Sequence, residues 1–325
     1  MPRDAVLLMA YGGPDNLDQV EAYYTDIRRG SPPPPALLEE LVDRYRMIGG
    51  RSPLSGIVEQ QRAALEVELA RRGRPIPVHA GMRHIEPRIA NVVEGIAAGG
   101  TDRMVAIALA PQRSSNGAGY RRAVEAGLAA AGAEAPEAVF VESWHAEPRF
   151  IEALAAATRE AMERFAEPDS VRVMFTAHSL PARVVAEGDT YADEIAATGR
   201  LVAERLGLAH FERAWQSAGR TGEPWLGPDL RDEMRRLAGE GVREIVISPV
   251  GFVAEHLEVL YDIDIEAQAT ARELGMHLER ARSMNADPTF IAALADVATA
   301  ALAESPNVPG PAAVPGQAAA SPVHA

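Results

Sequence analysis

Short apolar segments alternate with longer amphipathic segments along the chain, and this alternation predicts an α/β protein. The apolar segments are nearly continuous, which is typical of parallel strands that are buried on both faces of a sheet. The amphipathic segments carry their apolar residues at helical spacing. The predicted strands are 5–10, 77–80, 104–110, 138–141, 171–177, 212–216, 244–249 and 276–281. The predicted helices are 56–72, 87–98, 119–131, 150–165, 191–206, 229–239, 255–274 and 288–303.

This pattern of segments occurs twice in the chain. Residues 143–154 return in similar form as residues 283–294. Upstream of each copy, a Glu-Pro pair precedes a helix, a Gly-rich turn and a strand. The pair is Glu86-Pro87 in the first half and Glu223-Pro224 in the second. A repeat of this length predicts two similar domains that face each other across a cleft.

We therefore expect an α/β fold with two Rossmann-like domains, each with a four-stranded parallel sheet, related by internal duplication. The first domain would span 1–149 with an insertion at 23–53. The second would span 150–304, with its last helix packed back on the first domain. Residues 305–325 are rich in Pro, Ala and Gly with almost no charge, which predicts a disordered tail.

The insertion at 23–53 makes the first half about 30 residues longer than the second. It contains several arginines and tyrosines and the four consecutive prolines at 32–35. Arginine and aromatic side chains suit a lid over an anionic ligand. A surface excursion without a role in binding is the alternative interpretation.

The ends of the first strand in each half carry different chemistry. Ligands of open parallel sheets bind beyond the carboxyl ends of the strands. There the first half has Tyr11 and the second has His178, and both side chains can bind a metal. A hydrogen-bonding role is the alternative for His178. Neither the dinucleotide fingerprint G-x-G-x-x-G nor a P-loop sequence occurs, so the predicted fold does not indicate a dehydrogenase or an NTPase.

Three acidic residues recur every four positions in the predicted helix 255–274. Glu258, Asp262 and Glu266 would stack along one helical face. A solvated acidic face is one interpretation, and a path that conducts a divalent cation or protons is the other. The apolar residues between them argue against a fully exposed helix and favour the path.

Composition narrows the function classes. The net charge of −14 argues against nucleic acid as a partner. The mean hydropathy of −0.10 is that of a soluble protein, and no apolar run is long enough to cross a bilayer. The start of the chain does not resemble a signal peptide, so we expect a cytoplasmic location. The chain has no cysteine, which excludes disulfides and a cysteine-ligated iron–sulfur cluster.

Several motifs together resemble the ferrochelatases, in the same order and over roughly residues 4–304. They are Tyr11-Gly12-Gly13-Pro14, Ile27-Arg28-Arg29-Gly30, Tyr45 with Ile48-Gly49-Gly50, Ala177-His178-Ser179-Leu180-Pro181, Trp215-Gln216-Ser217 and Glu223-Pro224-Trp225-Leu226-Gly227-Pro228. The resemblance implies a chelatase-like fold and the insertion of Fe²⁺ into a porphyrin, a lyase reaction of heme biosynthesis. The short N-terminus, Tyr11 and the Ile-Arg-Arg-Gly sequence are most similar to the soluble monomeric branch that makes iron-coproporphyrin III.

The resemblance also implies roles for single residues. His178 and Glu258 would form the catalytic metal site on one face of the ring, and Tyr11 would be the axial ligand of the product iron on the other face. His84, Asp262 and Glu266 would belong to an acidic path for iron or protons. The residues implied in porphyrin binding are Arg28, Arg44, Tyr45, Ser52 and Tyr120. Arg113 stands where an aromatic residue is commoner in the family.

The expected partners are a porphyrin and ferrous iron as substrates, with no cofactor beyond that iron. We expect a monomer without membrane insertion, whose contacts with other enzymes of the heme pathway are transient. Two alternatives stay open. One is a chelatase for protoporphyrin IX, or for cobalt or nickel. The other is a non-catalytic heme-binding protein, which would have no need of a base such as Glu258.

Overall fold

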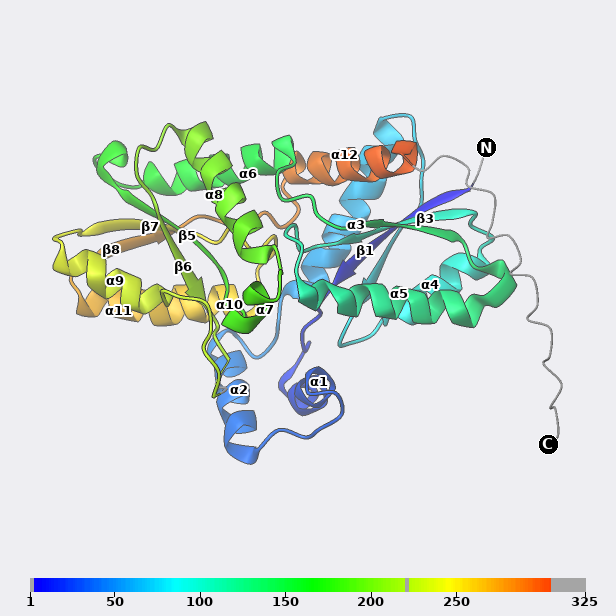
Figure 1. The fold of residues 1–325 in the computed structure, drawn as a ribbon, viewed down its shortest axis with the longest axis horizontal. Coiled ribbons are helices and arrows are strands. Elements are labelled where there is room, and N and C mark those ends of the chain that lie inside the picture. Colours follow the sequence, from blue (N-terminus) through cyan, green and yellow to red (C-terminus); the bar gives the residue numbers. More distant parts are fainter. Residues whose placement is uncertain (1–2, 220–221, 305–325) are drawn as a thin grey trace, which may run out of the picture.

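The chain folds into two four-stranded parallel sheets, which confirms the predicted α/β class (Figure 1). This computed structural model describes residues 3–219 and 222–304, and the predicted tail at 305–325 lies outside them. The strand orders are β2-β1-β3-β4 and β6-β5-β7-β8, so the same topology occurs twice. The strands are β1 Asp4–Ala10, β2 Val78–Met82, β3 Arg103–Ala108, β4 Glu137–Val141, β5 Arg172–His178, β6 Glu212–Gln216, β7 Glu244–Ser248 and β8 His277–Arg280.

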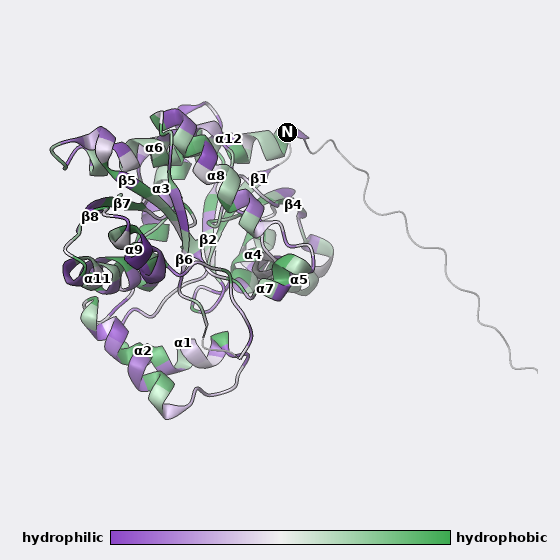
Figure 2. Ribbon diagram, turned by 60° about the vertical axis from the view of Figure 1, so that its left-hand side comes forward, coloured by the Kyte–Doolittle hydropathy of each residue, from purple (hydrophilic) through white to green (hydrophobic). Residues whose placement is uncertain are grey.

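Helices connect the strands and cover both faces of each sheet. In Figure 2 the strands of the second sheet are hydrophobic, whereas α9 and α11 outside them are largely hydrophilic. The helices are α1 Val20–Ile27, α2 Pro35–Met47, α3 Leu54–Arg71, α4 Ile89–Ala98, α5 Ala118–Ala131, α6 Pro148–Met162, α7 Ala182–Ala186, α8 Tyr191–Leu206, α9 Leu230–Gly239, α10 Leu257–Leu260, the π-helix η5 Asp262–Ala267, α11 Gln268–Glu273 and α12 Pro288–Glu304.

The two sheets share one hydrophobic core. Side chains of a strand alternate between its two faces, so Val6 and Leu8 of β1 point into a central core, whereas Leu7 and Met9 point into an outer one. Strand β5 divides its side chains in the same way. The central core also takes in residues of α3, α6, α8 and α12 from both halves. Apolar burial therefore holds the two sheets together as well as stabilising each of them.

The repeated segments form α6 and α12, which pack against each other across the middle of the molecule. Phe150 and Phe290 occupy equivalent places at their starts, are fully buried, and have ring centroids 6.2 Å apart. The ring of Trp144 lies 5.1 Å from Phe150 and 6.0 Å from Phe290. Helix α12 lies against α3, β3 and β4 of the first half.

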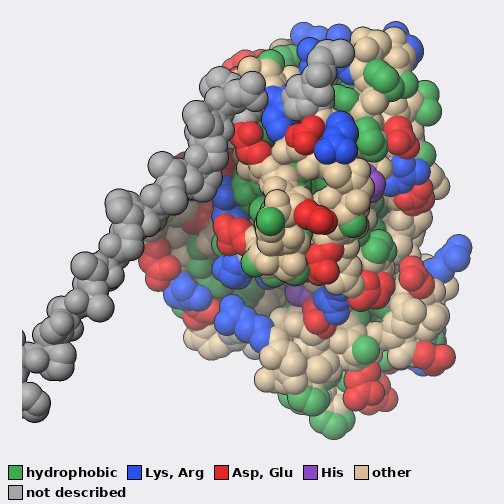
Figure 3. Space-filling view, turned by 90° about the vertical axis from the view of Figure 1, so that its right-hand side faces the viewer, with side chains coloured by type: hydrophobic (Ala, Val, Ile, Leu, Met, Phe, Trp, Pro, Cys, Tyr) green, Lys and Arg blue, Asp and Glu red, His purple; other side chains and the backbone are tan. Residues whose placement is uncertain are grey.

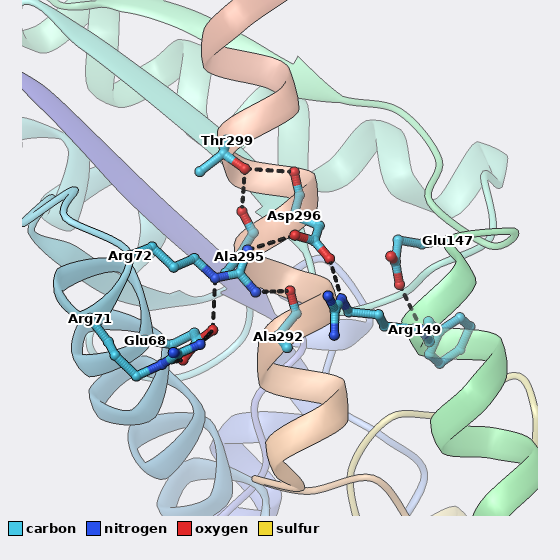
Figure 4. Close-up of polar contacts among 10 residues, drawn as sticks. Glu68, Arg71, Arg72, Glu147, Arg149, Ala292, Ala295, Asp296 and Thr299 are labelled. Atoms are coloured by element: carbon cyan, nitrogen blue, oxygen red, sulfur yellow. Dashed lines mark hydrogen bonds and ion pairs between the residues drawn. The ribbon is translucent and has the colours of Figure 1, made fainter.

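A small ion-pair network fixes α12 to its neighbours (Figure 4). Arg72, at the end of α3, lies between Glu68 at 2.7 Å and Asp296 of α12 at 2.6 Å. Asp296 also accepts from Arg149 of α6, at 2.8 Å. Arg72 further donates to the carbonyl oxygen of Ala292 at 3.1 Å. One carboxylate thus links three helices from distant parts of the sequence.

The predicted insertion contains two helices, α1 and α2, which stand apart from both sheets at the bottom of Figure 1. The sequence pattern did not predict these helices. Pro35 stands in the first turn of α2, where its missing N–H group costs no hydrogen bond. Val20, Tyr23 and Tyr45 form a small core of their own between the two helices. We call residues 20–47 the lid.

The structure corrects one equivalence in the repeat. The amide of Met82 donates to the Pro87 carbonyl at 2.8 Å, and the amide of Trp215 donates to the Pro228 carbonyl at 2.9 Å. Pro87 therefore corresponds to Pro228, and the prediction that paired it with Pro224 was wrong. Sequence similarity alone could not show this, because the loop from β6 to α9 is longer than the loop from β2 to α4.

The predicted helix 255–274 is divided into three pieces. His256 is extended, α10 begins after it, and the chain widens into a π-helix at Asp262. The amide of Glu266 donates to the carbonyl of Tyr261, five residues earlier, at 2.9 Å. Contacts outside the helix accompany this widening, since Asp264 pairs with Arg280 of β8 at 2.6 Å. The helical spacing of apolar residues in the sequence, from which helix 255–274 was predicted, does not reveal contacts with residues that are distant in the chain.

Candidate active site

The candidate site lies at the carboxyl ends of the central strands, on the side where the lid stands. Tyr11 directly follows β1, and His178 is the last residue of β5. In Figure 1, β1 and β6 point toward α1 and α2. The charge of Glu258 in the second half acts on the pKa of Tyr11 in the first, so the two halves meet electrostatically here.

His178 and Glu258 form the centre of the site. Nε2 of His178 lies 3.6 Å from Oε1 of Glu258, and both side chains are about one-third exposed. Nδ1 of His178 contacts the carbonyl oxygen of Ser179, which can only accept, so Nδ1 carries a proton. In the neutral imidazole, the lone pair of Nε2 then faces Glu258.

The distance of 3.6 Å is too long for a hydrogen bond but suits a shared metal ion. Two ligand atoms that each lie about 2.1 Å from one first-row divalent ion are separated by roughly this distance. His256 approaches the other oxygen of Glu258 at 3.5 Å. Among residues 3–219 and 222–304, no three His, Asp or Glu side chains are arranged to hold a metal ion.

Two carboxylates of the site have pKa values that are displaced in opposite directions. Burial tends to raise the pKa of Glu258, but the charges of His178, His256 and Arg44 outweigh it and lower the value to about 2. Burial and the charge of Glu258 raise the pKa of Asp262 to about 6. Glu258 is therefore ionised at neutral pH, whereas Asp262 titrates close to it.

Asp262 is buried, and its neighbours come from three elements. Ser217 donates to its carboxylate from the end of β6, in a left-handed conformation with φ of 59°. Arg44 of the lid lies with its guanidinium 5.0 Å from the centroid of the Tyr261 ring. Glu266 contacts Arg231 at 3.7 Å. Although the helix is divided, Asp262 and Glu266 still interact electrostatically with each other and with Arg44.

The first half contributes Tyr11, which follows β1, and His84, which follows β2. Their ring centroids are 4.3 Å apart. Nδ1 of His84 donates to Asp26 of the lid at 2.6 Å, and Arg88 binds the same carboxylate at 2.9 Å. Burial lowers the pKa of His84 and raises that of Tyr11 to about 12, so both are neutral at pH 7.

His84 was predicted as part of an acidic path, but its contacts among the described residues are with Tyr11, Tyr23 and Asp26. Its Nε2 is buried and has no hydrogen-bond partner among these residues. These neighbours thus belong to the first half, and its place in an acidic path stays a prediction.

The five residues implied in porphyrin binding do not share one environment. Arg28 is exposed at the end of α1, and Tyr120 is partly buried in α5. Tyr45 is buried inside the lid, where it hydrogen-bonds Tyr23. Ser52 is buried beside Gly13, where a Cβ would lie 2.6 Å from its hydroxyl oxygen. Tyr45 and Ser52 thus support the turn after β1.

Several residues around the site had no predicted role. His256 and Ser217 contact the two carboxylates, and Asp26 orients His84. Ser217 and Asp26 lie within or beside family-like motifs, and His256 lies two residues before Glu258 in the predicted helix 255–274. Nothing more in the sequence indicates their roles, because Ser217 and Asp26 have partners that are far away in the chain. Arg113 donates through its main-chain N–H to Glu194 at 2.7 Å, and its side chain is exposed.

None of the helices among the described residues combines the length and apolar character that a membrane crossing needs. The family model described as Ferrochelatase matches residues 3–302. The chain is 44% identical to a protein named ferrochelatase from Deinococcus radiodurans, with 90% of this chain and 94% of that protein covered. It is 40% identical to a coproporphyrin III ferrochelatase from a Geobacillus species, with 90% and 96% covered.

The fold is also similar to that of a solved structure, SirB from Bacillus subtilis with Fe³⁺. The TM-score is 0.57 at 13% sequence identity, with 92% of this chain and 95% of that chain covered. At this identity the similarity concerns the fold alone. The family match spans both sheets, the lid and the site. The chain belongs to the ferrochelatase family, whose reaction is the insertion of a metal into a porphyrin.

Proposed function

We propose that this protein inserts Fe²⁺ into coproporphyrin III, with His178 and Glu258 as the residues that bind the incoming iron. The observation that carries the proposal is the facing pair of Nε2 and Oε1 at 3.6 Å. The imidazole lone pair and the ionised carboxylate together suit a divalent ion that has to be released again. A relative at 40% identity is named coproporphyrin III ferrochelatase, which supports the choice of porphyrin.

Metal insertion releases two pyrrole protons, so the site needs a proton acceptor as well as metal ligands. With a pKa of about 2, Glu258 is a weak base and better suited to bind the cation. Asp262, with a pKa of about 6, is the better acceptor near neutral pH. Pairs of carboxylates whose pKa values are pushed apart in this way divide acid–base roles between them.

The other side of the ring would face Tyr11, whose hydroxyl would coordinate the iron of the product. The lid would close over the ring edge, where Arg28 and Arg44 can bind propionates through the guanidinium fork. No cofactor is needed beyond the ferrous substrate. We propose that the protein works as a monomer in the cytoplasm.

The test compares two porphyrins under anaerobic conditions. Ferrous iron and either coproporphyrin III or protoporphyrin IX are mixed with the protein, and metallation is followed by absorbance. We expect the higher kcat/KM with coproporphyrin III. Faster turnover of protoporphyrin IX would contradict the choice of porphyrin. Binding of both porphyrins without metallation of either would instead favour a heme-binding protein.

A further inference from the structure

A carboxylate near the end of α1 joins the lid to the first domain. Asp26 belongs to the lid, and two residues that follow β2 bind it. Arg88 donates to both of its oxygens through the guanidinium fork, at 2.9 Å and 3.0 Å. Nδ1 of His84 donates to the same carboxylate at 2.6 Å. Asp26 is therefore part of the lid by sequence and part of the loop between β2 and α4 by its contacts.

The contact with Asp26 decides which nitrogen of His84 carries the proton. Burial tends to raise the pKa of Asp26, but hydrogen bonds from Arg88 and His84 outweigh it and lower the pKa below its ordinary value. An ionised carboxylate can only accept, so Nδ1 is the protonated nitrogen of the imidazole. Nε2 is buried and has no hydrogen-bond partner among the described residues. The orientation of the imidazole thus depends on its contact with Asp26.

His84 is in turn linked to Tyr11 through the main chain and through the ring. Strands β1 and β2 pair as far as Ala10 and Met82, and the amide of His84 then donates to the Tyr11 carbonyl at 3.1 Å. The two ring centroids lie 4.3 Å apart, with the ring planes inclined by 53°. His84 is 7% exposed, whereas Tyr11 is 39% exposed. The buried imidazole therefore supports a phenol that reaches the site.

The lid also holds the turn that follows Tyr11. The hydroxyl of Tyr23 in α1 donates to the carbonyl of Gly12 at 3.1 Å, and its ring meets that of His84 edge-on, with centroids 6.4 Å apart. Gly12 has a φ of 87°, and a Cβ there would lie 2.6 Å from Cγ1 of Ile85. The turn is thus closely packed. The lid acts on both the backbone and the ring at this strand end.

The contact between Asp26 and Arg88 can be reached from outside the protein. Both residues line a surface hollow of about 540 Å³, together with Glu21 of α1. Their side chains are 36% and 34% exposed. Figure 3 views the side of the molecule that carries α4 and α5, where acidic and basic side chains are mixed and histidine is almost fully covered. A small anion in solution can therefore reach the place of the Asp26 carboxylate.

We propose that Asp26 is a positioning residue, through which the lid fixes the imidazole of His84 and thereby the direction of the Tyr11 phenol. This inference rests on the proposed role of Tyr11 as axial ligand of the product iron and names the group that aims this ligand. Outer contacts that orient a metal ligand commonly change metal binding or activity when they are removed. The lid then serves the iron ligand of its own half as well as the porphyrin.

The test compares Asp26→Ala with the wild type, first without iron and then with added iron-coproporphyrin III. Nitrogen NMR of the histidine rings should show His84 with its proton on Nδ1 in the wild type, and this form should no longer predominate in Asp26→Ala. The absorption spectrum of the complex should shift toward that of Tyr11→Phe. In a Tyr11→Phe background, Asp26→Ala should cause no further shift, because both changes act through the same phenol.

Chemical rescue separates positioning from a general loosening of the lid. Asp26→Ala leaves the donors of His84 and Arg88 beside the surface hollow, where added formate can accept from both. Formate should return the spectrum toward that of the wild type, and sodium chloride at the same concentration should not. The matched control Glu21→Ala removes a carboxylate from the wall of the same hollow and should change neither the NMR signals nor the spectrum.

A second variant, Arg88→Gln, keeps the Asp26 carboxylate but removes the fork that holds it. It should shift the spectrum in the same direction as Asp26→Ala and by less, because the hydrogen bond to His84 remains. Circular dichroism checks the fold of each variant.

Each outcome bears on a different claim. An unchanged proton position on His84 together with an unchanged spectrum in Asp26→Ala would overturn the positioning role. A shift that formate does not reverse, or that persists in the Tyr11→Phe background, would overturn it as well. Because iron-coproporphyrin III is added as such, a failure of the protein to metallate the porphyrin would refute the proposed function alone. If Tyr11→Phe leaves the spectrum unchanged, the axial ligand fails, and the NMR signals still decide whether Asp26 fixes His84.

Discussion

Strands β1 and β5 occupy the same position in their sheets, yet they end in different chemistry. The first strand is followed by Tyr11, a half-exposed phenol with a raised pKa that lies against His84. The second ends in His178, whose imidazole faces an ionised carboxylate. The duplicated framework therefore ends its two equivalent strands in different side chains, a phenol in one half and an imidazole in the other.

The connections after these strands differ more than the strands do. Between β1 and β2 the chain inserts the lid, whereas between β5 and β6 it has only the short helix α7 in addition to α8. The loop from β6 to α9 is longer than the loop from β2 to α4. It places the ring centroid of Trp225 6.5 Å from that of the His178 imidazole. Strands buried on both faces tolerate little change, while exposed connections can accept insertions.

Removal of the proposed metal ligand in the second half should have the largest effect on activity. His178→Ala deletes the nitrogen that faces Glu258, and we expect metallation to fall by about 10²- to 10⁴-fold. Porphyrin binding, measured by fluorescence quenching, should stay within a few-fold because the lid contacts are unchanged. The control His210→Ala removes an exposed imidazole and should retain wild-type activity. Wild-type rates in His178→Ala would exclude it from the metal site.

The equivalence of the two halves can be tested where they meet. Phe150→Ala and Phe290→Ala should each lower the free energy of unfolding by about 3–5 kcal/mol, because both rings are fully buried in the shared core. Chemical denaturation measures the loss, and the exposed Val67→Ala should cost less than about 0.5 kcal/mol. If only one of the two substitutions lowered the free energy of unfolding this much, Phe150 and Phe290 would not be equivalent in the shared core.

The raised pKa of Asp262 in the second half predicts that its contribution to stability depends on pH. Since its pKa rises from 3.8 to about 6 on folding, its contribution is full below pH 3.8 and is lost as the pH rises through about 6. Asp262→Asn removes the charge that faces Glu258 and Glu266. The variant should therefore be more stable than the wild type at pH 8, by up to about 3 kcal/mol.

This advantage of Asp262→Asn should disappear near pH 4, where the wild-type carboxyl is also neutral. Urea denaturation at several pH values gives the difference. An equal advantage at pH 4 and pH 8 would show that it does not come from the carboxylate charge, and no advantage at pH 8 would show that Arg44 and Ser217 already compensate that charge.

The smallest effect on activity is expected at Tyr11, the proposed axial ligand in the first half. Tyr11→Phe keeps the ring against His84 but removes the oxygen proposed to bind the product iron. The absorption spectrum of the bound product should shift, while the rate should change by less than about tenfold because the metal donors of the second half remain. Tyr24→Phe, a hydroxyl deletion in the lid, is the control. An unchanged spectrum would exclude Tyr11 as the axial ligand.

Much of this molecule was predictable from its sequence, because strands and most helices follow local patterns. All eight predicted strands are present, and the predicted α8 and β6 match their observed bounds. The lid helices were missed because prolines at 32–35 obscure the start of α2, where Pro35 is in fact favourable. The break at Asp262 was missed because its buried contacts come from β6 and the lid.

The sequence by itself determined the duplicated α/β framework, the family, and the two strand ends that carry Tyr11 and His178. Only the tertiary structure decided that Nε2 of His178 faces Glu258, that Asp26 orients His84, and that Arg88 holds the Asp26 carboxylate. The physical reason is the range of the interactions. Hydrophobic periodicity acts between neighbours along the chain, whereas pKa values and ion pairs depend on charges that only folding brings together.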